Sequence, residues 1–283
     1  MMMKRSSYLQ AGIVAMLILL LLVLVIPILS AFAVAFDSSK DSLKGGFMLF
    51  PREFSLEGFV KLFKQVGFLR PFINSTIILV FGTFFHVVTC SLAAYVLAQK
   101  NLPGAKIITI FIIATMSVPQ QILMMPQYIL YKQFSLTNTL SGMIIYNMAA
   151  GFSILLMKSY YMGVPKEMAE AAKMDGASNL LIFKKIYLPM VKSGLATIII
   201  IDAVARWNNY SAAVLFITEP KKYTIQQAIK AIVAFDDATS SSNLITPNVQ
   251  MAGVVVGMLP LVILYFALQK HFAKGLLAGA VKG

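Results

Sequence analysis

The chain has 283 residues, of which 59% are hydrophobic and only 12% are charged, and its mean hydropathy is +0.80. A protein surrounded by water needs roughly twice that share of charged residues, so this composition excludes a water-soluble globular protein. The net charge of +13 is explained by basic residues beside membrane spans, so it does not indicate a nucleic-acid-binding protein. We therefore expect an all-α integral membrane protein in contact with lipid.

Few residues that carry catalytic or metal chemistry are present. Cys90 is the single cysteine, which excludes an intramolecular disulfide, and His86 and His271 are the two histidines. These residues give almost no material for a zinc site or a cysteine–histidine catalytic pair. No GxxxxGK[ST] phosphate-binding loop occurs. We predict no catalytic residue, no metal site and no bound cofactor, so any ATP that powers this protein must be hydrolysed by another one.

Six apolar stretches are long enough to cross a bilayer, whose hydrocarbon core requires about 20 helical residues. They cover residues 9–36, 72–98, 107–131, 139–159, 191–217 and 248–270. Polar residues and prolines interrupt the third and the fifth stretch. The first follows Lys4 and Arg5 and is roughly twice as long as the apolar region of a signal peptide, so we predict that it is retained as a transmembrane helix.

Basic residues indicate the orientation of these six helices. With a cytoplasmic N-terminus, the inner segments contain far more basic than acidic residues; the basic ones are Lys4, Arg5, Lys100, Lys106, Lys158, Lys166, Lys173, Lys184, Lys185, Lys192, Lys270, Lys274 and Lys282. The positive-inside rule then places both termini in the cytoplasm. The expected organisation is an N-terminal transmembrane helix (1–36), an extracytoplasmic segment (37–71), a core of five transmembrane helices (72–270) that contains a cytoplasmic loop (160–190), and a cytoplasmic tail (271–283).

The extracytoplasmic segment contains apolar residues at helical spacing among charged ones, namely Phe54, Leu56, Phe59, Val60, Phe63 and Phe68. This pattern predicts a short amphipathic helix on the outer face of the membrane, where it could receive an external partner. A loop that is merely solvated fits the pattern almost as well.

The cytoplasmic loop predicts two short helices. Pro165 suits the first position of a helix, and Asp175 with Gly176 suits its left-handed end. Ser178 can cap a second helix, which we expect to end before Pro189.

Small residues follow one face of the first loop helix, because Ala169, Ala172 and Gly176 recur at helical spacing. A smooth ridge of this kind could enter a groove of a partner protein. The alternative is a surface hairpin that only joins the fourth and fifth spans.

The spacing of Glu170-Ala171-Ala172, Asp175-Gly176 and Leu188-Pro189 resembles the EAA loop of ATP-binding-cassette (ABC) importer permeases. Further segments are similar to the carbohydrate branch of that family, and the resemblance covers nearly the whole chain. They are Asn74-Ser75-Thr76, Leu92-Ala93-Ala94-Tyr95, Leu102-Pro103-Gly104, Pro126-Gln127-Tyr128, Trp207-Asn208-Asn209, Lys222-Tyr223-Thr224 and the terminal Gly279-Ala280-Val281-Lys282-Gly283. The run Gln269–Gly275 is similar to a subgroup for oligosaccharides or polysaccharide fragments.

The resemblance implies a maltose-permease-type subunit with the type I ABC importer permease fold, in a bacterial plasma (inner) membrane. Its implied partners are a second, different permease, a cytoplasmic ATPase dimer that binds ATP and Mg²⁺, and an extracytoplasmic sugar-binding protein. The first loop helix would be the coupling helix that docks on the ATPase, through Glu167, Glu170, Ala171, Ala172, Asp175 and Gly176. In some relatives the tail also reaches the ATPase, which is a weaker expectation for Lys282 and Gly283.

The fifth span contains the polar residues that we expect in a translocation path. Asp202, Arg206 and Asn209 lie on one helical face, and charges inside a membrane are costly unless they are paired or hydrated. The stripe could contact sugar hydroxyls, with Trp207 and Tyr210 beside it for stacking on sugar rings. The alternatives are an internal salt bridge for the charged pair and packing against a neighbouring helix for Trp207.

Other spans offer weaker candidates for the path. Gln120 follows Pro119, where a broken helix could line a cavity or simply kink. Tyr146 and Asn147 in the fourth span could contact sugar, although single polar residues more often join helices. Gly253 and Gly257 in the sixth span form a GxxxG pattern, which predicts close approach of another helix.

Three other functions were weighed against an energy-coupled permease. A stand-alone secondary transporter or channel predicts two matching inverted halves, which the chain lacks. An intramembrane enzyme needs an acid–base or nucleophile group that Asp202 does not supply alone. A permease for peptides or amino acids is disfavoured only by the resemblance to the carbohydrate branch.

Overall fold

The computed structural model describes residues 2–99, 102–234 and 245–280, with side chains for residues 9–99, 102–234 and 245–269. Every regular element within these residues is a helix, and a single β-bridge joins Asp37 and Phe54. The expectation of an all-α protein is therefore confirmed. The chain forms two compact units, residues 1–69 with 228–259 and residues 70–227 with 260–283.

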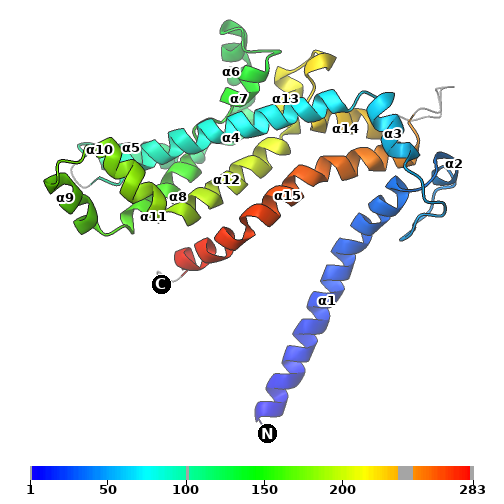
Figure 1. Ribbon diagram of the computed structural model, residues 1–283, viewed down its shortest axis with the longest axis horizontal. Coiled ribbons are helices and arrows are strands. Elements are labelled where there is room, and N and C mark those ends of the chain that lie inside the picture. Colours follow the sequence, from blue (N-terminus) through cyan, green and yellow to red (C-terminus); the bar gives the residue numbers. More distant parts are fainter. Residues whose placement is uncertain (1, 100–101, 235–244, 281–283) are drawn as a thin grey trace. The chain divides into compact units, whose positions relative to one another are not determined.

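The first unit contains two of the helices that are long and apolar enough to span a membrane (Figure 1). They are α1 (Met2–Ala35), with a candidate span over Leu9–Ala35, and the first part of α15 (Pro247–Ala280), with a candidate span over Pro247–Gln269. The short helices α2 (Ser39–Ser42) and α3 (Glu57–Lys64) and the end of α14 (Ile225–Val233) complete this unit.

Polar contacts fix the segment between α1 and α3. The side chain of Asn248 in α15 donates to the backbone oxygen of Asp37 at 3.0 Å. The Asp37 carboxylate accepts the backbone N–H groups of Arg52 and Glu53 at 3.1 and 3.0 Å. These bonds supply partners for buried polar groups at the start of the segment.

The amphipathic helix expected in residues 37–71 is present as α3, although it covers only Glu57–Lys64. Leu62 is fully buried, whereas Val60 is 49% exposed. The GxxxG prediction is confirmed at Gly253, because a Cβ there would lie 2.5 Å from Cδ1 of Ile232. A larger side chain than glycine would therefore push α14 away from α15.

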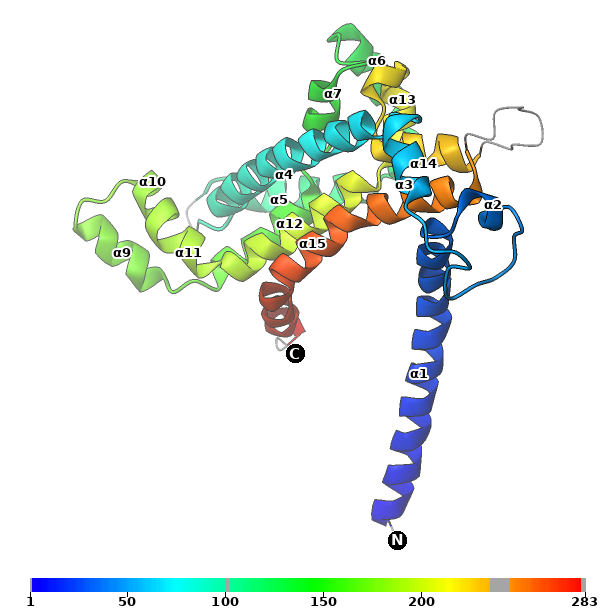
Figure 2. The same ribbon diagram turned by 45° about the vertical axis from the view of Figure 1, so that its right-hand side comes forward.

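The second unit contains the remaining elements. They are α4 (Leu69–Leu97), α5 (Ala105–Met116), α6 (Gln120–Gln133), α7 (Leu140–Ile145), α8 (Gly151–Met162), α9 (Lys166–Met174), α10 (Asn179–Ile182), the π-helix η1 (Phe183–Tyr187), α11 (Leu188–Met190), α12 (Lys192–Trp207), α13 (Tyr210–Phe216) and the 3₁₀ helix η2 (Pro220–Lys222). In both views α9 and α10 extend beyond the end at which α4 leads to α5, and α6, α7 and α13 gather near the other half of α4 (Figures 1 and 2).

Three described helices could each span a membrane alone, and up to five spans result if each of two bent helix pairs counts as one. The described residues therefore contain three to five candidate spans, whereas we expected six, of which the third and the fifth are interrupted. The predicted break at Pro119 is confirmed, because α5 and α6 meet there at 100°. The fifth stretch is also broken, between Trp207 and Tyr210.

Two local predictions were wrong. The fourth stretch is not one helix, since α7 ends at Ile145 and α8 begins only at Gly151. The second helix of the loop 160–190 does not end before Pro189, because η1 widens the helix into a π-turn and α11 continues through the proline. A wider turn relieves the clash between the proline ring and the preceding turn.

One apolar core joins α4, α8, α12 and the segment from α9 to η1. Its buried members are Cys90, Ala94, Leu97, Ile154, Met157, Tyr161, Val164, Ile182, Phe183, Tyr187, Val191 and Ile198. Close helix contacts surround it: a Cβ on Gly194 would lie 2.6 Å from the ring of Tyr160, and α12 therefore packs tightly on α8.

Candidate functional site

A polar pocket of about 300 Å³ lies in the second unit, where the broken helices come together. Amides, hydroxyls, methionines and one pair of opposite charges line it. The lining residues are Gln120, Gln121, Met124, Met143, Tyr146, Asn147, Asp202, Ala205, Arg206, Asn209 and Ser211. They come from α6, from α7 and the segment after it, from α12 and from α13.

The charged pair consists of Asp202 and Arg206, one turn apart on α12. Two contacts join them, from Nε of Arg206 to Oδ2 of Asp202 at 3.2 Å and from Nη2 to Oδ1 at 3.3 Å. Their side chains are only 5% (Arg206) and 2% (Asp202) exposed. Thr83 of α4 donates its hydroxyl to Oδ2 of Asp202 at 2.7 Å. The internal salt bridge that we considered is therefore present, and it connects α12 to α4.

Arg206 also holds the end of α7. Its Nη1 donates to the backbone oxygens of Met143, Ile144 and Tyr146 at 3.0, 3.3 and 2.9 Å. The last carbonyl groups of a helix lack partners within the helix and carry partial negative charge. The guanidinium satisfies them, which explains why the fourth stretch can break inside an apolar segment after Ile145.

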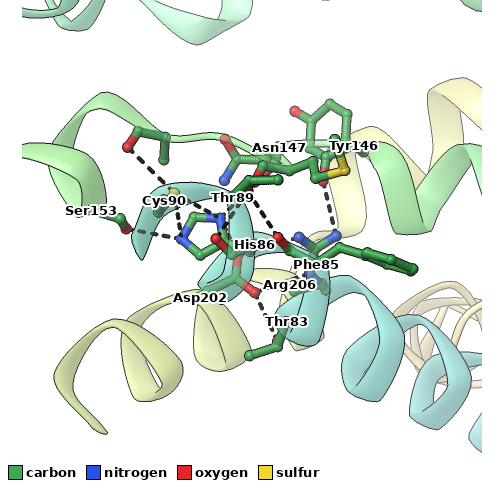
Figure 3. A network of polar contacts seen from close by, with 12 residues as sticks. Thr83, Phe85, His86, Thr89, Cys90, Tyr146, Asn147, Ser153, Asp202 and Arg206 are labelled. Carbon is green, nitrogen blue, oxygen red and sulfur yellow. Dashed lines mark hydrogen bonds and ion pairs between the residues drawn. The ribbon is translucent and has the colours of Figure 1, made fainter. Parts of the chain in front are cut away.

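His86 holds the other side of the same break (Figure 3). The ring is 1% exposed. Its Nδ1 lies 3.0 Å from the backbone oxygen of Asn147 and 3.3 Å from Oδ1 of Asp202, and its Nε2 lies 2.9 Å from Oγ of Ser153 in α8. One side chain of α4 thus contacts α8, α12 and the segment between α7 and α8.

The structure brings together most of the residues that we predicted for a translocation path. Gln120, Tyr146, Asn147, Asp202, Arg206 and Asn209 all line the polar pocket. The side-chain amide of Gln120 donates to the hydroxyl of Tyr146 at 2.6 Å. Asn209 also caps α13, because its Oδ1 accepts the backbone N–H of Ala212 at 3.0 Å.

Trp207 and Tyr210 are not among the lining residues of this pocket. Trp207 is 3% exposed and its ring meets the edge of Phe72 in α4 at 6.0 Å between centroids. The alternative of helix packing is therefore confirmed for Trp207. Tyr210 is 40% exposed.

Sequence reasoning missed His86, Thr83 and Gly82 of α4. A Cβ on Gly82 would lie 2.6 Å from Cζ of Arg206, so only glycine leaves room for the guanidinium. The available signal was a histidine inside an apolar span, since buried polar groups in a membrane have a partner. Among the described residues, no group of three or more His, Cys, Asp or Glu side chains could hold a metal ion.

The loop of residues 160–190 forms the two helices that we expected. Pro165 precedes α9 instead of occupying its first position. Gly176 ends the helix with a φ of +80°, and Oγ of Ser178 accepts the backbone N–H of Leu181, as predicted. The expected contact of the tail through Lys282 and Gly283 lies outside the described residues.

The alanine ridge contacts the core of the same chain. Ala169 and Ala172 are partly buried against it, together with Ala177, whereas nothing lies within 4 Å of a Cβ at Gly176. Met174 on the opposite face is 89% exposed, and Met168 beside the ridge is 46% exposed. Small side chains let α9 lie close to its own unit, so a spacing pattern of alanines did not reveal which protein they contact.

Comparison with known proteins gives a consistent result over nearly the whole chain. The family model described as binding-protein-dependent transport system inner membrane component matches residues 87–277. Protein LplC of Bacillus subtilis (strain 168) is 30% identical over 266 residues, which are 92% of this chain and 90% of LplC.

Two further relatives from the same organism have names that state a substrate. The polygalacturonan/rhamnogalacturonan transport system permease protein YtcP is 30% identical over 92% of this chain and 93% of its own length. The melibiose/raffinose/stachyose import permease protein MelC is 34% identical over 83% of this chain and 84% of its own.

Solved structures show the same fold. One chain of a bacterial ABC transporter involved in the import of the acidic polysaccharide alginate matches with a TM-score of 0.84 and 24% identity, over 95% of this chain and 98% of that chain. A second match, with a TM-score of 0.61 and 18% identity over 93% of both chains, comes from an alginate ABC transporter in complex with an alginate pentasaccharide-bound periplasmic protein.

Proposed function

Since the chain belongs to the family of binding-protein-dependent transport system inner membrane components, we propose that it carries oligosaccharides through one half of the translocation path of an ABC importer. Members of this family are permease subunits in the inner membrane and are not enzymes, because a separate subunit hydrolyses ATP. Relatives that are named for oligosaccharides and polysaccharide fragments support a sugar as the cargo.

The polar pocket is the observation that carries this proposal. It combines the side-chain amides of Gln120, Asn147 and Asn209 with the hydroxyl of Tyr146, and such groups both donate to and accept from sugar hydroxyls. The two charged residues of the pocket, Asp202 and Arg206, are paired with each other, so the pocket does not require a charged ligand. The proposed path comprises Gln120, Tyr146, Asn147, Asp202, Arg206 and Asn209, with Trp207 and Tyr210 beside the junction of α12 and α13.

The proposed topology has six spans and two cytoplasmic termini. Residues 1–36 would form the first span and 37–71 an extracytoplasmic segment. Residues 72–270 would form the permease core with the cytoplasmic loop 160–190, and residues 271–283 the tail. Support comes from the basic residues of the inner segments. The described residues contain up to five candidate spans if each bent pair counts as one.

The proposed assembly contains a second permease subunit, a cytoplasmic ATPase dimer that holds ATP and Mg²⁺, and an extracytoplasmic sugar-binding protein. The solved alginate transporter in complex with a periplasmic protein supports the last of these partners. No cofactor is proposed for this chain itself.

Coupling to the ATPase is proposed for α9 and the turn after it, through Glu167, Glu170, Ala171, Ala172, Asp175 and Gly176. The exposed residues of this set lie on the solvent side of α9 together with Met168 and Met174, whereas Ala172 faces the core. Exposed methionines adapt to an apolar groove because their side chains are flexible. We therefore assign docking to the methionine face, with Ala172 as a spacer between α9 and the core.

The test is reconstitution of the chain with the permease, ATPase and binding protein that co-purify with it. Uptake into proteoliposomes is measured for raffinose, arabinotriose, trigalacturonate and a tripeptide, with ATP inside. ATP-dependent uptake of at least one saccharide, and none of the tripeptide, is expected. Uptake of the tripeptide alone would show that the cargo is a peptide and not a sugar. If the chain purifies without an ATPase, the proposed importer assembly is wrong.

A further inference from the structure

The segment between α7 and α8, residues 146–150, places two polar side chains in the pocket without regular secondary structure. Tyr146 and Asn147 both line the pocket. Asn147 adopts a left-handed backbone conformation with a φ of +55°, in which asparagine is enriched among the residues other than glycine. The segment makes few hydrogen bonds of its own, such as the one from the Met148 N–H to the Ile145 oxygen at 3.0 Å, and segments of this kind open easily unless other elements hold them.

Four side chains from other helices contact backbone oxygens of this segment, and one of them is Cys90, whose Sγ lies 3.9 Å from the oxygen of Ala150. Arg206 of α12 donates a hydrogen bond to the backbone oxygen of Tyr146. Nδ1 of His86 lies 3.0 Å from the backbone oxygen of Asn147, and Thr89 donates to the backbone oxygen of Met148 at 2.6 Å. Figure 3 shows His86 and Thr89 on successive positions of the same face of α4, below the segment.

The contacts of His86 determine which ring nitrogen carries a proton. The backbone oxygen of Asn147 and the carboxylate of Asp202 are both acceptors near Nδ1, so Nδ1 is the donor. In the neutral ring, Nε2 then accepts the hydroxyl of Ser153. The ring therefore joins the last residue of the pocket lining before α8 to the first turn of α8 itself.

We propose that His86 is a positioning residue that holds Asn147 in the polar pocket through the bond from Nδ1 to the Asn147 backbone oxygen. The inference rests on the proposed function, in which this pocket belongs to the sugar path. His86 does not line the pocket and is almost completely buried, so it acts on the cargo only through the lining residues that it contacts, Asn147 and Asp202.

Two substitutions separate the two sides of the ring. In His86→Asn the amide nitrogen lies near the position of Nδ1 and restores the bond to Asn147, whereas in His86→Gln it lies near Nε2 and restores only the contact with Ser153. His86→Ala removes both. Ser91→Ala is the matched control, because Ser91 of α4 bonds Tyr161 of α8 at 2.5 Å, is equally buried, and does not line the pocket.

The first measurement is ATP-dependent uptake per assembled transporter, using the panel saccharide that the wild type imports fastest, together with the number of ATP molecules hydrolysed per sugar. We expect at least tenfold lower uptake and more ATP per sugar in His86→Ala and His86→Gln. His86→Asn should stay within about threefold of the wild type, and Ser91→Ala should keep the wild-type ATP-to-sugar ratio.

The second measurement is amide hydrogen exchange of residues 146–150, which requires no sugar. Faster exchange is expected in the Ala and Gln variants and wild-type exchange in His86→Asn and Ser91→Ala. The positioning role is overturned if all three His86 variants behave alike. It is also overturned if uptake in the His86 variants falls only in proportion to the melting temperature and Ser91→Ala falls on the same line. If the wild type imports none of the saccharides while the exchange pattern is as expected, the proposed cargo fails and the positioning role remains.

Discussion

Gly82 of α4 and Arg206 of α12 are in such close contact that a Cβ on the glycine would lie 2.6 Å from the guanidinium carbon. The glycine gives Arg206 the space to reach Asp202 and three backbone oxygens at the end of α7. The absence of a side chain at Gly82 of α4 thus allows Arg206 of α12 to bind the end of α7. This contact is the basis of the first prediction.

Gly82→Ala should destabilise the protein by about 1–3 kcal/mol, the usual cost of inserting extra atoms into a packed site. Thermal unfolding of the purified chain measures this effect. Gly12→Ala is the control, because nothing lies within 4 Å of a Cβ at Gly12 in α1; it should be neutral or slightly stabilising, as alanine favours helix. Equal melting temperatures for the two variants would contradict the tight contact.

Asp202→Asn and Arg206→Gln should each destabilise the protein by about 3–5 kcal/mol, since each leaves a buried charge without its partner. The double variant should lose clearly less than the sum of both, because no unpaired charge remains. A double-mutant cycle from unfolding in mixed micelles measures the difference. Strictly additive losses would mean that the two side chains act independently despite contacts of 3.2 and 3.3 Å.

Ala172→Phe and Met174→Asp should act differently, although the two residues are neighbours on α9. Ala172 packs on the core, so phenylalanine there should lower stability by about 1–3 kcal/mol. Met174 is 89% exposed, so aspartate there should leave the melting temperature unchanged and reduce ATP-driven uptake about tenfold, if the exposed face docks on the ATPase. The opposite result would be normal uptake in Met174→Asp, together with normal stability but no ATP-driven uptake in Ala172→Phe. That result would indicate that the alanine face docks on the ATPase.

Tyr146→Phe should reduce sugar uptake by roughly two- to tenfold. The variant removes a hydroxyl that accepts from Gln120 at 2.6 Å, and a hydrogen bond of this kind contributes about 0.5–1.5 kcal/mol. Tyr265→Phe is the matched control, because Tyr265 of α15 is 53% exposed and does not line the polar pocket. Initial uptake rates at saturating ATP measure both variants, and equal losses would argue against a special role of the pocket hydroxyl.

Helix breaks that have a local cause could be predicted, and breaks with a distant cause could not. Pro119 interrupts the third stretch by its own chemistry, and the structure confirms that break. Residues 146–150 contain neither proline nor glycine. Their break depends on Arg206 and His86, which are distant in sequence, so the local pattern read as one continuous helix.

The site shows the same limit. The shared face of Asp202 and Arg206 was predictable, because helical spacing and the cost of buried charge are local properties. Asn209 joins them in the pocket from the junction after α12, not from the same helical face. The part played by His86 depends on which helices pack together, and one histidine inside an apolar run does not reveal its partners. The alanines of α9 were recognised as a packing face, but only the fold shows that the chain itself fills that face.

The inward face of α9 shares one apolar core with α4, α8 and α12. The contact is made by Ala169 and Ala172, which are partly buried against that core, so a displacement of α9 would reach α8 and α12 through these two residues. α8 begins directly after residues 146–150, and Arg206 of α12 bonds the oxygen of Tyr146. The shared core therefore connects α9 to the two helices that hold the segment beside the pocket.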